Sequence, residues 1–247
     1  MDLKKGIKMS ESNSNWRSLY KIAGVATIIL LIYSLATMLI MFGAGVPPTT
    51  AHEILEMLSQ NQLMGLLRLD ALTTLVMPLY YLLFLSLFIA LRKSHEVGAT
   101  ITLLLGSAGL TLFLAAPSFI SWMVLSEKFA IADQAQKTLL LAAGETILAT
   151  DLWHSSSAFV GGLLLQTSML LISLVMLRSN TFSKLTAWVG VVTHSLDLAH
   201  IPFLLFFPTI GTILMIFGGT LYLVWFPLLA RDFFHLAKSG SLENTAD

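Results

Sequence analysis

Six long apolar segments set the strongest limit on what this chain can fold into. Each is long enough to cross a hydrocarbon core of roughly 30 Å as a helix, which takes about 20 residues. Only helices and closed barrels satisfy their backbone in lipid, and these segments lack the alternation of barrel strands. The sequence therefore predicts an all-α bundle of six transmembrane helices, near residues 19–43, 65–91, 98–125, 152–177, 185–206 and 209–230.

The composition agrees with a membrane protein. Hydrophobic residues make up 56% of the chain and charged residues only 11%, whereas soluble domains carry about 25% charged residues. The formal net charge is zero, so no overall basic field attracts nucleic acid, and the lipid bilayer is the expected partner. Cysteine is absent, which excludes disulfides, thiol nucleophiles and cysteine-ligated metals.

The distribution of basic residues predicts the orientation in the membrane. Lys and Arg gather before the first segment and in every second connection, and the side richer in them faces the cytoplasm. Both termini are then cytoplasmic, in a multi-pass protein of the bacterial inner membrane. The apolar part of the first segment is too long for a cleaved signal peptide. We expect cytoplasmic tails at 1–15 and 237–247, around a single membrane domain at 16–236.

Two of the connections on the outer side have the pattern of short amphipathic helices. In the segment 49–62, Thr49 or Thr50 can cap a helix and Glu53 is placed for a capping box. Apolar residues then recur at helical spacing. The segment 132–151 is also amphipathic and is too polar to cross lipid. We expect both to lie on the outer face of the bundle.

Ionisable residues within the apolar segments are the best candidates for a functional site. Counting 1.5 Å per residue from the segment ends places most of them in the outer half of the membrane and His194 near its middle, while Glu145 belongs to the outer segment 132–151. An ionised group facing lipid costs about 2.5–3.5 kcal/mol, so these side chains should face one another. They predict a polar pocket open to, or just under, the outer face, formed by Arg68, Asp70, Glu145, Asp151, His154, His194, Asp197 and His200.

The stretch "THSLDLAH" (193–200) restricts the geometry of this pocket. His194 and His200 are separated by roughly 9 Å along a helix, too far to share one metal ion easily. Residues three apart can converge, so Asp197 pairs with either histidine, and Asp151 and His154 form a similar pair. These two pairs carry the nitrogen and oxygen ligands that zinc or iron accepts, and they predict a possible metal site at Asp151, His154, Asp197 and His200.

Four functions remain open at this point. The leading one is binding of a small ligand, a lipid or a cation at the pocket. A metal-dependent intramembrane hydrolase would use the four ligands named above and a metal-bound water as nucleophile. A proton- or substrate-coupled transporter would use the same residues as a relay, although the nearly charge-free inner half counts against a hydrophilic route. Alternatively, the Asp and His side chains only hold helices together.

Two further segments are "ATDLWHSSSAFVGG" (149–162), which opens the fourth span, and "FSKLTAWVGVV" (182–192), which leads into the fifth. With the order of the spans, they resemble a family of bacterial six-span membrane proteins classed as a domain of unknown function. The resemblance covers roughly 15–235 and implies an integral inner-membrane protein of this size, without implying an activity. The matching residues are Asp151, Trp153, His154, Lys184, Trp188 and Gly190. Seven-span zinc amide hydrolases of membranes are similar only in residue types, since this chain lacks their His-x3-His pair.

Overall fold

The computed structural model describes the whole chain except residues 1–2, 46–47, 117–118, 151–154 and 243–247. Within the described residues the secondary structure is helical and contains no strand. The helices are α1 (Leu3–Ala44), α2 (Ala51–Gln60), α3 (Gln62–Arg68), α4 (Ala71–Val76), α5 (Leu79–Leu114), α6 (Phe119–Ile131), α7 (Gln134–Leu148), α8 (Ser156–Arg178), α9 (Lys184–Phe206) and α10 (Pro208–Leu242). The all-α prediction is confirmed.

Several of these helices are long and apolar enough to cross a membrane, which supports the prediction of a membrane protein. Among the described residues, five continuous stretches meet this criterion by length and composition. One of them combines α5 and α6, and the others belong to α1, α8, α9 and α10. Their ranges are Trp16–Ala44, Leu79–Ile131, Ser156–Arg178, Lys184–Phe206 and Pro208–Lys238.

Helix α5 folds back on itself at His95. The hydroxyl groups of Tyr81 and Thr111 lie 2.7 Å apart although 30 residues separate them, a span of roughly 45 Å along a straight helix. His95 has non-helical dihedrals (φ −156°, ψ 73°), and its Nδ1 accepts a hydrogen bond of 3.2 Å from the Gly98 N–H. This bond caps the helix that follows. The element therefore contains two antiparallel segments joined by a tight turn.

The bundle is held together by α1, α5, α8, α9 and α10. Helix α5 packs along α8, and α10 packs along both α9 and α1. At Gly109 and Gly161 the backbones of α5 and α8 touch, because a Cβ at Gly109 would lie 2.6 Å from the Leu165 nitrogen. Small residues allow this close approach between helices in lipid. The largest buried side chains of the core belong to Phe84, Trp225, Phe226 and Phe233.

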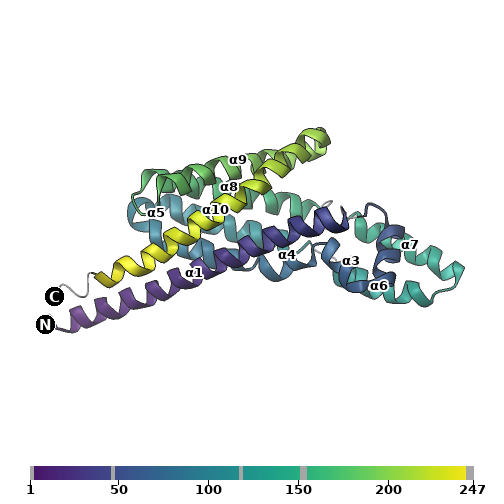
Figure 1. The fold of residues 1–247 in the computed structure, drawn as a ribbon, viewed down its shortest axis with the longest axis horizontal. Coiled ribbons are helices and arrows are strands. Elements are labelled where there is room, and N and C mark those ends of the chain that lie inside the picture. Colours follow the sequence, from purple (N-terminus) through teal and green to yellow (C-terminus); the bar gives the residue numbers. More distant parts are fainter. Residues whose placement is uncertain (1–2, 46–47, 117–118, 151–154, 243–247) are drawn as a thin grey trace.

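Helices α2, α6 and α7 form a small separate structure, called the lobe below, at one end of the bundle (Figure 1). Its core contains six buried side chains from α2 and α6: Ala51, Ile54, Leu55, Leu58, Trp122 and Phe129. Thr50 caps α2, since its Oγ1 accepts a bond of 3.3 Å from the Glu53 N–H. A capping box formed by Asp133 and Gln136 begins α7. Both predicted amphipathic helices are therefore present.

Two helix boundaries differ from the predicted spans. The predicted span 65–91 is interrupted, because α3 ends at Arg68 and Asp70 adopts a left-handed conformation (φ 54°), which breaks a right-handed helix. The predicted span 98–125 ends at Leu114, and α6 packs its Trp122 into the lobe instead. Hydrophobicity alone does not distinguish a side chain that faces lipid from one that faces a protein core.

The first and last helices of the chain extend into the predicted tails. Helix α1 begins at Leu3 and α10 continues to Leu242, so most of 1–15 and part of 237–247 are helical, while their cytoplasmic location stays a prediction. Neither segment contains a proline, the residue that most strongly stops a helix. The lack of hydrophobicity ended the predicted spans there, but it does not end the helices.

Candidate functional site

Asp197 lies at the centre of a hydrogen-bonded group in the middle of the bundle. Its side chain projects from α9 and is 5% exposed. The Tyr222 hydroxyl of α10 donates to Asp197 Oδ2 at 2.6 Å. The Gln166 amide of α8 donates to the same oxygen at 3.2 Å. The carboxylate therefore joins three helices through neutral donors.

His194 extends this group one turn along α9. Its Nδ1 lies 3.0 Å from Gln166 Oε1. Because the Gln166 nitrogen donates to Asp197, its oxygen faces the imidazole, so His194 Nδ1 carries the proton and donates. In the neutral ring Nε2 then holds a lone pair. This nitrogen is buried and has no hydrogen-bond partner among the described residues.

His200 faces the other oxygen of Asp197. Its Nδ1 lies 3.8 Å from Asp197 Oδ1, and it too has no hydrogen-bond partner in the described part of the chain. Asp197 and His200 are therefore neighbours, as their spacing of three residues predicted. The distance between them is that of an ion pair and is too long for a hydrogen bond. His194 and His200 lie on opposite sides of the carboxylate, each with one ring nitrogen unpaired.

Aromatic side chains surround the group on its inner side. The Trp225 ring meets His194 edge to face at 4.6 Å between centroids, and its Nε1 has no hydrogen-bond partner among the described residues. Tyr222 stacks on Phe226 at 5.1 Å. These rings pack against His194 and Tyr222, the neighbours of Asp197, and supply apolar surface to this part of the bundle.

Two glycines allow the close packing of this region. A Cβ at Gly218 of α10 would overlap Asp197 Oδ1, whereas a Cβ at the neighbouring Gly219 would meet nothing within 4 Å. A Cβ at Gly190 would lie 2.6 Å from Trp225 Nε1. The side chain of Asp197 therefore rests against the backbone of α10, and little space is left beside it.

The depth of Asp197 corrects one prediction. Its partner Gln166 is ten residues after Ser156, where α8 begins, or roughly 15 Å along the helix. Asp197 thus lies level with the middle of α8, instead of level with its outer end. The predicted partners Asp151 and His154 lie outside the described residues. The sequence argument considered only Asp, Glu, His, Lys and Arg side chains and so missed Gln166 and Tyr222.

A second polar group surrounds Asp70, near the lobe. The Tyr33 hydroxyl of α1 donates to both carboxylate oxygens of Asp70, at 2.9 and 3.1 Å. The Thr73 hydroxyl donates to Asp70 Oδ2 and also lies against the Tyr33 hydroxyl. This group ties the start of α4 to α1, and we call it the Tyr33 group.

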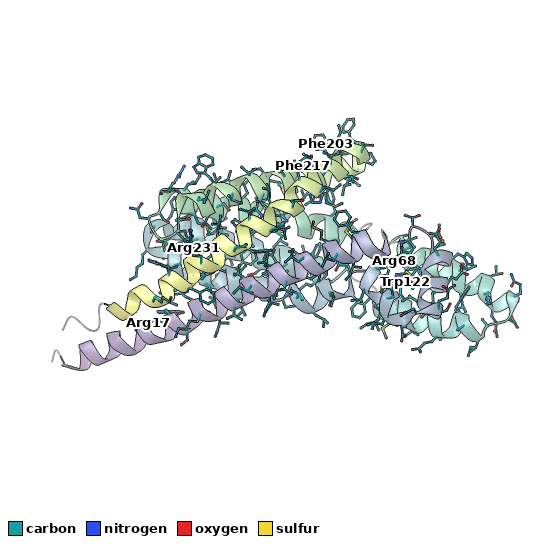
Figure 2. All side chains as sticks on the ribbon, in the orientation of Figure 1. Arg17, Arg68, Trp122, Phe203, Phe217 and Arg231 are labelled. Carbon is teal, nitrogen blue, oxygen red and sulfur yellow. The ribbon has the colours of Figure 1, made fainter. Side chains whose placement is uncertain are left out.

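Arg68 lies at the junction between bundle and lobe (Figure 2), where its guanidinium approaches Gly45 at the end of α1.

The structure does not bring Asp70 and Asp197 into one pocket. Asp70 is bonded by Tyr33 and Thr73, whereas Asp197 is bonded by Tyr222 and Gln166 and lies near His200. The single polar pocket of the prediction is therefore replaced, in the described part of the chain, by two groups with different partners.

Glu145 does not belong to either group, which corrects another prediction. Its Oε1 accepts a hydrogen bond of 3.1 Å from the Ala51 N–H at the start of α2. The first N–H groups of a helix lack partners within the helix and attract a carboxylate. Glu145 therefore joins α7 to α2 inside the lobe.

A third polar group, which the sequence argument missed, lies at the opposite end of the bundle. Asp232 Oδ2 accepts bonds from the Thr186 hydroxyl at 2.6 Å and from the Ser183 N–H at 3.0 Å. Asp232 Oδ1 accepts from Arg231 at 2.8 Å. Ser183 caps α9, since its Oγ accepts from the Thr186 N–H at 3.1 Å, and Asp232 ties this helix start to α10. The motif "SKLT" (183–186), with its cap hydroxyls, is the sequence signal that predicts this helix start.

The predicted metal site is only partly described. Among the described residues, no group of three or more His, Asp or Glu side chains is arranged to hold a metal ion. Two of the four predicted ligands, Asp151 and His154, lie outside the described residues. The metal site remains a prediction.

Comparison with models of known protein families, with curated proteins and with solved structures found no match to this chain. The resemblance of residues 149–162 and 182–192 to a family of six-span membrane proteins therefore stays a prediction. Inferences about function rest on the geometry of the three polar groups and on the helical, apolar character of the bundle.

Proposed function

We propose that this chain is a multi-pass protein of the bacterial inner membrane with six crossings and both termini in the cytoplasm. The fold-back of α5 at His95 supports two crossings for that element, beside those of α1, α8, α9 and α10. The amino end of α1 and the carboxyl end of α10 lie at the same end of the bundle (Figure 1). Arg17 and Arg231 lie toward that end (Figure 2), which is the arrangement of a cytoplasmic side.

The function we propose is reversible binding of a small cation at Asp197. One observation carries this proposal: among the described residues, the buried carboxylate is hydrogen-bonded only by neutral donors, and the unpaired His200 Nδ1 lies 3.8 Å from its Oδ1. A buried negative charge without a cationic partner is unstable in lipid. A bound cation supplies the missing charge.

The surroundings of Asp197 favour a cation over the other ligands considered. The carboxylate oxygens of Asp197 accept hydrogen bonds, so a ligand beside them must donate or carry positive charge. The contact of Asp197 with the α10 backbone at Gly218 leaves little room for a lipid or a large solute.

The hydrolase alternative depends on Asp151 and His154 together with Asp197 and His200. It predicts stoichiometric zinc or iron in the purified protein, lost in His200→Ala. Elemental analysis of the detergent-purified chain tests this alternative directly. A coupled transporter also requires cation binding at Asp197. The transporter alternative therefore uses the proposed site and does not compete with it.

The test measures thermal unfolding of the detergent-purified protein across a pH series and in sodium, potassium, ammonium, magnesium and zinc salts. A ligand that binds the folded state at 100 times its Kd stabilises it by about 2.7 kcal/mol. We expect one of these cations, the proton included, to raise the unfolding midpoint of the wild type and not that of Asp197→Asn.

Asp232→Asn is the matched control, because it also neutralises a buried carboxylate of the bundle. We expect it to lower the midpoint in every condition and to keep the response to the cation. An equal response of wild type and Asp197→Asn to all conditions would overturn the proposal.

A further inference from the structure

Arg17 of α1 has one edge of its guanidinium group without a partner. It lies toward the end of the bundle where the chain begins and ends (Figure 2), and its side chain is partly buried. Its Nε and Nη2 atoms are buried, and neither forms a hydrogen bond in the described part of the chain. These two nitrogens form one edge of the planar group and donate in parallel, so they match a pair of oxygens on a carboxylate or a phosphate.

The face of α1 that carries Arg17 is turned toward α10. Gly24 follows Arg17 by seven residues, which is two helical turns, and therefore lies on the same face. A Cβ at Gly24 would lie 2.8 Å from the ring of Phe234 in α10. Helix α10 packs along α1 and continues past Phe234 to Leu242. Arg17 is therefore on the side of α1 that faces a neighbouring helix.

The described acidic side chains do not supply the missing acceptor. Asp232, the buried carboxylate at this end of the bundle, is already bonded by Arg231 and by the start of α9. Among the described residues, no other carboxylate pairs with Arg17. An arginine is always charged in a protein, and a partly buried one without an anion is unstable. The anion that Arg17 lacks therefore has to come from outside this part of the chain.

The level of Arg17 along the bundle points to the lipid headgroups. The apolar stretch of α1 that is long enough to cross a membrane begins at Trp16, so Arg17 lies where the hydrocarbon core meets the headgroup layer. Tryptophan is typical of that boundary. The guanidinium of Arg92, from α5, lies 5.7 Å from the centre of the Trp16 ring. No described carboxylate pairs with Arg92, so a second positive charge lies beside the same tryptophan.

We infer that Arg17 binds the phosphate group of an anionic lipid in the leaflet at this end of the bundle. Its Nε and Nη2 atoms donate to two of the phosphate oxygens, and Arg92 adds positive charge near the headgroup. Basic positions between transmembrane helices are suited to lipid headgroups of this kind. The inference goes beyond the proposed function, because the site is separate from Asp197 and does not depend on cation binding there.

The experiment measures the thermal unfolding midpoint of the delipidated, detergent-purified protein during a titration with phosphatidylglycerol, which carries a phosphate and a net negative charge. Parallel titrations use phosphatidylcholine, whose phosphate charge is balanced by choline, and inorganic phosphate. A ligand that binds the folded state stabilises it. We therefore expect the midpoint of the wild type to rise with phosphatidylglycerol and to change little with the other two, and the titration gives the apparent affinity.

Variants of Arg17 separate the paired donors from the charge. We expect phosphatidylglycerol to bind Arg17→Gln roughly tenfold or more weakly than the wild type, because the charged donors are lost. Arg17→Lys keeps the charge without the paired edge, so its affinity should lie between the two. It also tests the site if Arg17→Gln does not fold. Lys93→Gln is the matched control: Lys93 is exposed next to Arg92, and its loss removes the same charge. It should bind the lipid nearly as well as the wild type.

The outcomes distinguish the site, the contact and the source of the phosphate. Equal affinities in Arg17→Gln and Lys93→Gln would overturn the site, since only the total charge of this end would then matter. Wild-type affinity in Arg17→Lys would overturn the paired contact. A midpoint that rises equally with inorganic phosphate would overturn the lipid as the source of the phosphate. Asp197→Asn should bind phosphatidylglycerol as the wild type does, so the test is independent of the proposed function.

Discussion

Two aspartates of the bundle are buried to nearly the same degree but have opposite surroundings. Asp197 is 5% exposed and Asp232 is 7% exposed. Asp232 has the guanidinium of Arg231, a backbone N–H and the Thr186 hydroxyl as donors. Asp197 has a phenol and an amide, with an imidazole at 3.8 Å.

This difference separates a structural carboxylate from a candidate binding site. The charge of Asp232 is balanced by Arg231. Its hydrogen bonds to Ser183 and Thr186 join the start of α9 to α10. The charge of Asp197 is balanced only if a cation binds or a histidine takes up a proton. Burial alone therefore does not identify a functional carboxylate, while the type of its donors does.

The largest effect is expected for Asp232→Ala. It removes the acceptor that ties the Ser183 N–H and the Thr186 hydroxyl at the start of α9 to α10, so we expect a loss of about 3 kcal/mol in the free energy of unfolding. Equilibrium unfolding in detergent measures it. Asp232→Asn, which keeps one acceptor oxygen, should lose less. If Asp197→Ala is equally destabilising under all conditions, the two carboxylates have the same structural role and the comparison fails.

A smaller effect is expected for Gly218→Ala. The added methyl group overlaps Asp197 Oδ1 and must push α10 or the carboxylate aside, which costs about 2 kcal/mol. Gly219→Ala is the matched control, because its Cβ meets nothing within 4 Å and alanine favours the helix by roughly 0.5–1 kcal/mol. Equal unfolding free energies for the two variants would contradict the close contact between Asp197 and α10.

The smallest of these effects is expected for Tyr222→Phe. It removes the shortest hydrogen bond of Asp197, 2.6 Å long, and we expect a loss of about 1 kcal/mol in unfolding free energy. It should also change the pH response of the protein, since Asp197 loses a donor. Tyr81→Phe removes a hydroxyl bond to Thr111 at an exposed position and should leave that response unchanged. A shift of similar size in both variants would show that the Asp197 bond has no special role.

Much of the architecture could be predicted from the sequence. Apolar segments of sufficient length predicted a helical membrane protein, and the spacing of Ile54, Leu55 and Leu58 predicted the buried face of α2. The lobe was harder. Residues 119–131 are apolar enough for lipid, but their Trp122 and Phe129 pack on α2, a long-range contact that local hydropathy does not contain.

The candidate site was predicted in part. The pair Asp197 and His200 followed from their spacing on one helix. The neutral members Gln166 and Tyr222 did not, because a lone glutamine or tyrosine in an apolar segment gives no signal before its neighbours are known. Asp70 was grouped with Asp197 on depth alone, whereas the left-handed turn at Asp70 and its bonds to Tyr33 place it in a separate group.

The central claim is that Asp197 is the carboxylate that changes state when the ligand binds, and infrared difference spectroscopy tests it most directly. Spectra of the purified protein are recorded with and without the stabilising cation, or at two pH values if the cation is the proton. We predict a change in the carboxyl bands that is lost in Asp197→Asn and kept in Asp232→Asn. A change that persists in Asp197→Asn, or that disappears only in Asp232→Asn, would contradict the account.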